Sequence, residues 1–279
     1  MKGVILAAGY GTRFLPATKT LPKEMLPLID KPTIAFIIEE FVRSGIKDVI
    51  VVTSRRKKVM DDYFDRESEL EELFTREQSR KKLEKILPAD INVAFVRQQE
   101  MNGSGHALLA AAPWLGNEPC VVAYPDDLHF GEEPLAKQLI DAYHQNGQCQ
   151  LATMTCATEE LERYGVVAFD DAGKVTSIVE KPARGTAPSN QASIGRFLYT
   201  SKFFTLLQEE ADKFTDKGEF YHTHGLNRMM ALGEVGSVSF SGQRLDVGEP
   251  AGYLEATFSY AQQHAEFAPI LADLIKKFS

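Results

Sequence analysis

The first 53 residues alternate between apolar runs and one amphipathic segment. Residues 3–7 and 48–53 are short and apolar, as buried strands are. Between them, apolar residues recur at the i, i+3, i+4, i+7 spacing of one helix face, and Gly45 follows as a stop signal. This order of strand, long loop, helix and strand predicts a βαβ unit in a parallel sheet. The helix face consists of Ile34, Ile37, Ile38, Phe41 and Val42.

Predicted strands continue to alternate with predicted helices to about residue 156. Residues 66–86, rich in Glu, Lys, Arg and Leu, predict an exposed helix with a solvated face. The run Arg55-Arg56-Lys57-Lys58 just before it is either an anion-binding patch or, more commonly, a surface helix start. The other predicted elements are strands at 91–96, 120–124 and 150–155 and helices at 106–112 and 134–144.

The pattern changes after residue 156. Two apolar segments, 164–169 and 174–180, flank Asp170-Asp171-Ala172-Gly173, which predicts a β-hairpin. No repeat or linker divides the chain, so we expect one α/β domain over residues 1–279, with a mostly parallel sheet, an antiparallel insertion and a helical tail. The remaining expectations are a polar loop at 183–192, strands at 194–199 and 234–240, helices at 201–212 and 222–232, and two helices from about 250.

The composition narrows the function classes. The formal net charge of −8 argues against general binding to nucleic acid or anionic membranes, so any anionic ligand must meet a local cluster of cations. Three cysteines without a CxxC pair argue against a disulfide framework or a structural zinc site. We find no signal-peptide pattern and no apolar run near the roughly 18 residues of a spanning helix, so we expect a cytoplasmic protein.

The loop after the first strand carries candidate chemistry. Gly9-Tyr10-Gly11 lacks the third glycine of a dinucleotide fingerprint, because Phe14 stands there, and no Walker A sequence occurs. Alone, this turn is as well explained by chain geometry as by ligand binding. Arg13 and Lys23 in the same proline-restricted loop favour a polyphosphate site, because arginine offers phosphate a planar fork and lysine a point charge.

The loop GYGTRFLPATKTLPKEMLPLIDKP resembles the signature loop of the sugar-1-phosphate nucleotidylyltransferases, and most closely that of the bacterial members that transfer uridylyl groups. The similarity continues, in order, through VVTSRRKKVMDDYFD, VRQQEMNGSGHAL, YPDD, YGVV, VEKP, APSNQASIGR and DVGEPAGY. The family fold implied is a Rossmann-like, mostly parallel sheet flanked by helices. In it, residues 1–156 bind the nucleotide, and residues 157–279 hold the small antiparallel sugar-binding insertion and the helical C-terminal tail.

The resemblance implies that UTP and glucose 1-phosphate give UDP-glucose and pyrophosphate by Mg²⁺-assisted, direct in-line displacement. The attacking sugar phosphate is already an anion, so the reaction needs positioning, cations and metal rather than a protein nucleophile. The alternatives are a relative that uses dTTP or another sugar 1-phosphate, and a non-catalytic regulatory relative that binds nucleotide sugars.

The resemblance also implies a role for each matching residue. The roles implied are catalysis for Arg13, Lys23 and Lys181; nucleotide binding for Ala7, Ala8, Gly9, Gly11, Gln98 and Gly103; sugar binding for Gly165, Glu180, Asn190, Gly195 and Glu219; and Mg²⁺ binding for Asp126 and Asp246.

Two points stay open within this resemblance. Asp127 either reaches the metal through water or caps a turn. The segment GEFYHTH at 218–224 departs from the DEIQLTD-like pattern of the family at Tyr221 and His224, which leaves the sugar open to galactose 1-phosphate or an amino-sugar phosphate. His222 and His224 have a spacing that suggests metal, but on a helix they would point about 200° apart, so we expect packing or solvent roles.

The expected partners are UTP, glucose 1-phosphate and further copies of the same chain. Family members are commonly dimers or tetramers, and the C-terminal segment repeats apolar positions at Tyr253, Ala256 and Tyr260 that either fill the core or join subunits.

Overall fold

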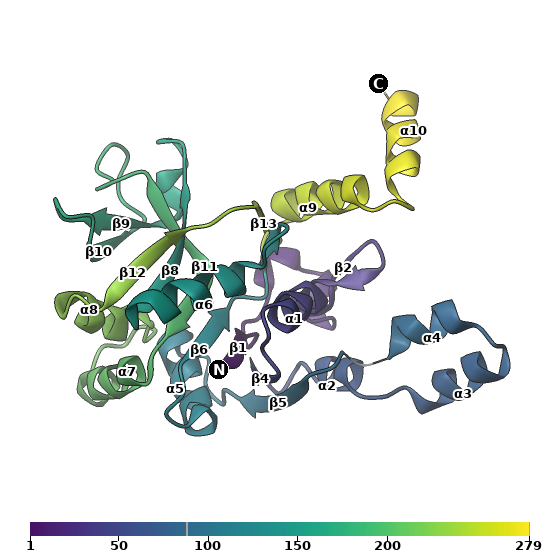
Figure 1. Cartoon of the computed structure of the whole chain (residues 1–279), viewed down its shortest axis with the longest axis horizontal. Coiled ribbons are helices and arrows are strands. Elements are labelled where there is room, and N and C mark those ends of the chain that lie inside the picture. Colours follow the sequence, from purple (N-terminus) through teal and green to yellow (C-terminus); the bar gives the residue numbers. More distant parts are fainter. Residues whose placement is uncertain (88, 279) are drawn as a thin grey trace.

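A nine-stranded sheet forms the centre of the computed structural model, which describes residues 1–87 and 89–278 (Figure 1). Seven of its strands follow the order β10-β9-β11-β6-β1-β4-β5, while β8 pairs with β11 and β12 off this path. The predicted βαβ unit is confirmed: β1 (Lys2–Leu6), α1 (Thr33–Arg43) and β4 (Asp48–Thr53) follow one another, and β1 and β4 pair in parallel. Two further parallel strands, β5 (Asn92–Arg97) and β6 (Cys120–Ala123), flank this pair.

The antiparallel part of the sheet begins at β11 (Gln191–Tyr199), which pairs with β6, β8 (Cys149–Thr155) and β9 (Gly165–Phe169). The predicted hairpin is confirmed as β9 and β10 (Val175–Glu180), and β12 (Val235–Ser239) joins β8 in parallel. The chain therefore has a parallel half on one side of β6 and a mainly antiparallel half on the other, as expected.

Helices cover both faces of the sheet and create two cores. Along β1, Ile5 faces the core that contains α1 and α6 (Leu135–Asn146), whereas Val4 faces the opposite core. This alternation places successive strand residues on opposite faces, each covered by helices. The helices of the second face are α5 (Gly103–Leu115), α7 (Ser201–Lys213) and α8 (Thr223–Ala231).

The single helix predicted over residues 66–86 is wrong. The structure has α2 (Val59–Phe64), α3 (Ser68–Arg76) and α4 (Arg80–Ile86), and Gln78 adopts a φ of 54° between the last two. A left-handed residue ends a helix, so the charged segment folds as a pair of short helices extending from the body (Figure 1).

Four short strands were absent from the prediction. β7 (Asp127–Phe130) pairs with β13 (Gln243–Asp246), and β2 (Pro27–Leu28) pairs with β3 (Lys31–Pro32). The tail consists of α9 (Pro250–Gln263) and α10 (Ala268–Phe278), and α10 has no buried residue. In the described part of the chain, no helix has the length and apolar character needed to cross a membrane.

Candidate functional site

The opening loop leaves the carboxyl end of β1 and folds as three 3-10 turns: η1 (Thr12–Phe14), η2 (Ala17–Lys19) and η3 (Lys23–Met25). Gly11 supplies the left-handed conformation before η1, with a φ of 67°, and its carbonyl accepts a 2.7 Å hydrogen bond from Thr18 Oγ1. Pro16 and Pro22 stand directly before the next two turns and fix their entry angles. The loop therefore has a defined conformation with Gly9 and Tyr10 exposed at its start.

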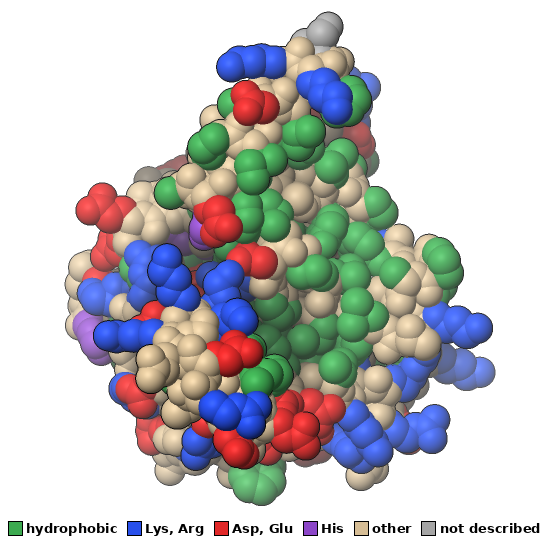
Figure 2. Space-filling model, turned by 90° about the vertical axis from the view of Figure 1, so that its right-hand side faces the viewer, with side chains coloured by type: hydrophobic (Ala, Val, Ile, Leu, Met, Phe, Trp, Pro, Cys, Tyr) green, Lys and Arg blue, Asp and Glu red, His purple; other side chains and the backbone are tan. Residues whose placement is uncertain are grey.

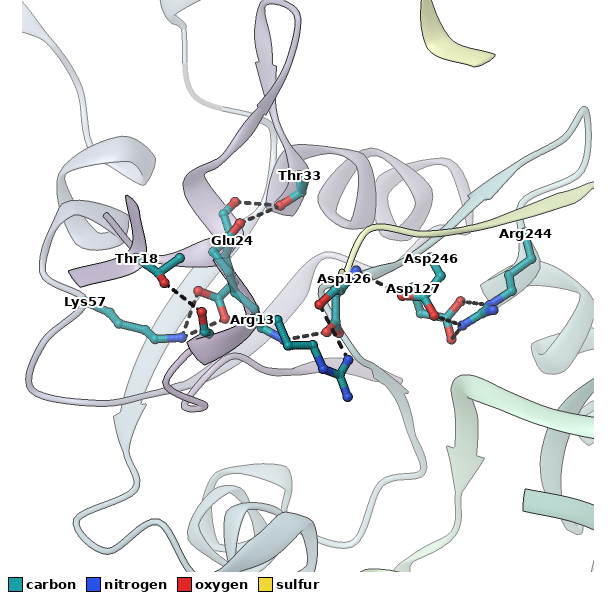
Figure 3. Close-up of polar contacts among 12 residues, drawn as sticks. Arg13, Thr18, Glu24, Thr33, Lys57, Asp126, Asp127, Arg244 and Asp246 are labelled. Carbon is teal, nitrogen blue, oxygen red and sulfur yellow. Dashed lines mark hydrogen bonds and ion pairs between the residues drawn. The ribbon is translucent and has the colours of Figure 1, made fainter. Parts of the chain in front are cut away.

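A buried ion pair fastens the loop to the rest of the fold. Glu24 is 1% exposed and Lys57 is 5% exposed, and the lysine donates to both carboxylate oxygens at 2.7 and 2.8 Å. Thr33 at the start of α1 donates to the Glu24 carbonyl at 3.0 Å (Figure 3). Lys57, from the basic run that follows β4, is thus a structural anchor for the residue next to Lys23.

Three predicted site residues meet beside this anchor. Lys23 Nζ contacts the Asp126 carboxylate, and Arg13 lies next to both, with its guanidinium 3.5 Å from the Gly248 carbonyl (Figure 3). Burial favours neutral Asp126, but the ammonium of Lys23, a backbone hydrogen bond and the charge of Arg13 together outweigh burial and lower the pKa of Asp126. In return, the Asp126 carboxylate raises the pKa of Lys23 against the effect of burial. The site therefore holds these groups in charged form.

The two predicted metal ligands converge although 120 residues separate them in the sequence. Asp126 follows β6, Asp246 ends β13, and the Val247 N–H donates to the Asp126 carbonyl at 2.8 Å. A Cβ added at Gly248 would lie 2.8 Å from Asp126 Oδ2 and 3.0 Å from Asp246 Oδ1, so both carboxylates flank one point. Two convergent carboxylates fit Mg²⁺, which takes oxygen ligands and completes its shell with water and substrate phosphates. Among residues 1–87 and 89–278, no group of three or more His, Cys, Asp or Glu side chains is placed to hold a metal.

Arg244 joins Asp246, the second candidate metal ligand, to Asp127. Its guanidinium donates to Asp127 Oδ1 at 2.7 Å and to Asp246 Oδ2 at 3.1 Å, and its other terminal nitrogen donates to the Tyr164 hydroxyl at 3.0 Å. Arg244 was not among the predicted site residues, although its position two residues before Asp246 on a strand places both side chains on one face. That spacing was the signal that could have found it.

Asp127 is buried and hydrogen-bonded to other parts of the fold. It is 7% exposed, and its Oδ2 accepts the Gly195 N–H at 2.7 Å. Its carbonyl accepts a 3.0 Å hydrogen bond from Arg196, whose guanidinium is paired with Glu40 at 2.9 and 3.0 Å in the buried interior. Of the two roles left open for Asp127, these contacts favour the fixing of local structure.

The nucleotide-side residues lie along the carboxyl ends of the parallel strands. Ala7 and Ala8 are buried at the end of β1, with the Ala7 N–H donating to the Val52 carbonyl at 2.8 Å. Gln98 follows β5 and is 5% exposed, and its side-chain amide donates to the Gly103 carbonyl at 3.1 Å. Gly103 has a φ of 88°, and a Cβ there would collide with the Phe220 carbonyl, so this glycine permits close packing of two loops.

The predicted sugar residues are spread over neighbouring strands. Gly165 of β9 lies opposite Glu180 of β10 and Ser193 of β11, which forms a row across three strands. A Cβ on Gly165 would lie 3.0 Å from the Glu180 carboxylate. Asn190 is exposed just before β11, and Lys181 is exposed just after β10 with a φ of 45°.

Glu219 approaches this row from the segment before α8. Its hydrogen bond raises the pKa of Tyr221, with a further contribution from Glu180, so the Tyr221 hydroxyl lies near both carboxylates. In contrast, the space beside Gly195 is filled by Tyr124 and Asp127, because a Cβ there would lie 2.7 and 2.9 Å from them. Glu180 and Glu219 therefore share one region, while Gly195 packs behind it.

Residues 2–263 match the nucleotidyl transferase family. The chain belongs to this family. A relative, the UTP–glucose-1-phosphate uridylyltransferase 2 of Staphylococcus saprophyticus, is 39% identical to this chain over 282 residues, which cover 99% of this chain and 97% of the relative. The UTP–glucose-1-phosphate uridylyltransferase of Bacillus subtilis is 38% identical, again with 99% of this chain and 97% of the relative covered. The family predicted from the signature loop is confirmed.

Solved structures of nucleotidyl transferases share the fold. The UTP-bound UGPase of Acinetobacter baumannii superimposes with a TM-score of 0.91 at 30% identity, covering 100% of this chain and 99% of that one. A UDP-glucose pyrophosphorylase complexed with UDP-glucose gives a TM-score of 0.80 at 35% identity, with 95% and 100% covered. The predicted fold class is therefore confirmed over nearly the full length.

Proposed function

We propose that this nucleotidyl transferase moves UMP from UTP to glucose 1-phosphate and releases pyrophosphate. The observation that carries the proposal is the meeting of Lys23 and Arg13 with the convergent carboxylates of Asp126 and Asp246. Cations and a metal-binding pair at one point suit a reaction that brings two anions together. The names and bound ligands of the relatives support uridylyl transfer in particular.

The chemistry is a single in-line displacement at the α-phosphorus of UTP. A phosphate oxygen of glucose 1-phosphate forms the new P–O bond, and the bond to the bridging oxygen of the β-phosphate breaks. The electron pair of that bond leaves with pyrophosphate, so negative charge grows on the leaving group. We assign Lys23 and Arg13 to the triphosphate, where their positive charges would offset this growth. Mg²⁺ held by Asp126 and Asp246 would supply further charge neutralisation on phosphate oxygens.

The fixed loop supports this reaction because it is already folded. The Glu24–Lys57 pair and the proline-bounded turns hold Lys23 before any phosphate arrives, which limits the entropy lost on binding. We place the base of UTP near Gln98 and the Gly103 loop, and the α-phosphate near Gly9 and Gly11.

We assign the sugar to the row that contains Glu180 and Gly165, with Glu219 and Asn190 at its margins. Carboxylates and amides bind adjacent hydroxyls, and a site built to pair with a hydroxyl rejects the sugar that lacks it. Lys181 at the end of β10 would meet the phosphate of the same sugar. The whole chain then acts as one domain, with the nucleotide in residues 1–156 and the sugar in residues 157–279.

We also infer a cytoplasmic homo-oligomer. The three cysteines are all unpaired, as a reducing compartment allows. On the outside of the tail, Leu254, Phe258 and Ile270 are 59, 48 and 57% exposed. Figure 2 shows hydrophobic side chains gathered on the face that lies below the protruding α10. Because monomers rarely expose large apolar areas, we expect this face to pair with another copy, as a dimer or tetramer in light scattering.

The proposal is tested by a grid of pyrophosphate-release assays with purified protein. Each of UTP, dTTP, ATP and GTP is combined with glucose 1-phosphate, galactose 1-phosphate and glucosamine 1-phosphate, with and without Mg²⁺. We expect the highest kcat/KM for UTP with glucose 1-phosphate and loss of turnover without Mg²⁺. Absence of turnover in every cell of the grid would refute an enzymatic role, and a preference for galactose 1-phosphate would correct the sugar.

A further inference from the structure

The segment 218–224, which departs from the family pattern, is fastened to the start of α5, where the nucleotide residue Gly103 lies. The Phe220 N–H donates to the Asn102 carbonyl at 3.0 Å, and the Gly105 N–H donates to the Phe220 carbonyl at 2.9 Å. Side chains at Gly103 and Gly105 would collide with Phe220, so the segment and the start of α5 approach as closely as their backbones allow. A segment that carries the sugar residue Glu219 is therefore in direct contact with the helix start assigned to the nucleotide.

His222 connects this segment and the start of α5 to the end of β6, which precedes the candidate metal ligand Asp126. Its Nδ1 lies 2.8 Å from Ser104 Oγ in the first turn of α5 and 3.2 Å from the Tyr124 hydroxyl. Its backbone N–H donates to Ser104 Oγ at 3.2 Å, which satisfies an amide at the start of α8. Tyr124 stands two residues before Asp126, so one imidazole contacts all three segments.

Aromatic rings surround this imidazole. Its ring centroid lies 5.0 Å from that of Phe197 and 6.3 Å from those of Tyr124 and Tyr199, which form an aromatic wall. Burial lowers the pKa of His222 to about 4, so at neutral pH the ring is neutral. With its proton on Nε2, Nδ1 offers one lone pair that accepts a hydrogen bond from the Ser104 or the Tyr124 hydroxyl.

We propose that His222 is a positioning residue that couples the nucleotide and sugar sites. It holds the start of α5 at Ser104, the strand end at Tyr124 and the segment of Glu219 in a single arrangement. This inference rests on the proposed function, since it takes one substrate from each side. A nucleotide that binds at the start of α5 then also constrains the sugar segment through His222, so each substrate binds more tightly when the other is present. The coupling is reciprocal by thermodynamic necessity.

The coupling is measurable without turnover. The probe is a UTP analogue with a methylene group between its α- and β-phosphorus atoms, which cannot release pyrophosphate. Calorimetry gives the Kd of glucose 1-phosphate alone and in saturating analogue, and the ratio of the two is the coupling factor. We expect a factor of at least about fivefold for the unmodified chain, at the lower end of common coupling energies.

Three variants separate positioning from general stability. In His222→Leu, which keeps volume but removes the acceptor, we expect a factor near one and less than about threefold change in the Kd of the analogue alone. His222→Asn, which can place an oxygen near the Nδ1 position, should restore most of the coupling. His224→Leu is the matched control, since His224 stacks on Phe220 with centroids 5.0 Å apart in the same segment. It should keep the coupling of the unmodified chain.

Ser104→Ala provides a second test in case the His222 variants do not fold. This single substitution should by itself abolish the coupling between the two substrates. Unchanged coupling in His222→Leu or in Ser104→Ala would overturn the inference, as would a factor of one in the unmodified chain. The proposed function is judged separately by turnover of the unmodified chain with UTP and glucose 1-phosphate. If that turnover is present while the variants keep their coupling, the positioning role alone is refuted.

Discussion

The Lys23 ammonium contacts the Asp126 carboxylate although 103 residues separate them in the sequence. The contact joins the loop after β1 to the end of β6, two neighbouring parallel strands. In open α/β sheets, ligands bind outside such carboxyl ends, so the contact lies where the fold offers a site. The lysine keeps the carboxylate ionised, and an ionised carboxylate is the form that binds Mg²⁺.

Loss of Lys23 should impair turnover while the fold remains. We expect Lys23→Ala to lower kcat by about 10²–10³-fold, the usual cost of removing one group that stabilises developing charge. Lys81→Ala on the exposed helix α4 is the matched control and should change kcat by less than twofold. Steady-state kinetics and thermal unfolding decide the point; near-normal kcat in Lys23→Ala would remove Lys23 from the site.

The adjacent aspartates should have opposite phenotypes. Asp127→Ala leaves the Gly195 N–H without its acceptor and removes a charge partner of Arg244, so we expect a loss of about 3–5 kcal/mol in the free energy of unfolding. Asp126→Ala should cost at least about 2 kcal/mol less stability than Asp127→Ala, yet abolish most of the Mg²⁺-dependent turnover. Urea unfolding and kinetics are measured on both variants. The reverse pattern would show that Asp127 is the metal ligand.

The Glu24–Lys57 pair should behave as a buried ion pair. Either Glu24→Leu or Lys57→Met alone leaves one buried group uncompensated, and we expect each to lower the free energy of unfolding by about 3–5 kcal/mol. The combined variant Glu24→Leu/Lys57→Met should recover part of this loss, because no unpaired charge remains. A double-mutant cycle in urea measures the coupling, and strictly additive losses would contradict it.

Stability should rise with pH between about 4 and 6.5 through His222. The folded state has a depressed pKa of about 4 against the ordinary 6.5, so in this window the unfolded chain binds a proton that the folded chain does not. The contribution is complete above 6.5 and is lost as pH falls toward 4, with a maximum of about 3 kcal/mol. Unfolding free energies of the unmodified chain and of His222→Asn are compared across this range. Equal slopes for the two proteins would contradict the burial of a neutral imidazole.

Local pattern was enough to predict most of the main sheet. The helix from Thr33 and the strand from Asp48 follow from apolar spacing and a glycine stop, because each buries one face or both. The pairs β7–β13 and β2–β3 were missed because their strands have only four and two residues. Too few positions remain in such strands for a period to be visible.

Individual residues of the candidate site could be predicted from the sequence, but their proximity in the structure could not. Arg13 and Lys23 were visible as cations in one loop, but the approach of Asp246 to Asp126 depends on long-range pairing that no local pattern encodes. The anchoring role of Lys57 was hidden because a basic run usually lies in solvent, and its partner Glu24 is 33 residues away. His222 gave no useful signal either, because its partners Ser104 and Tyr124 lie 118 and 98 residues away.

The most direct test of uridylyl transfer to glucose 1-phosphate is a competition followed by ³¹P NMR. Equal concentrations of UTP and dTTP are mixed with glucose 1-phosphate, Mg²⁺ and the purified chain, so that the initial product ratio reports the ratio of kcat/KM values. We predict that UDP-glucose and pyrophosphate appear together in equal amounts and that UDP-glucose exceeds dTDP-glucose. Failure to form either nucleotide sugar, or an excess of dTDP-glucose, would contradict the account.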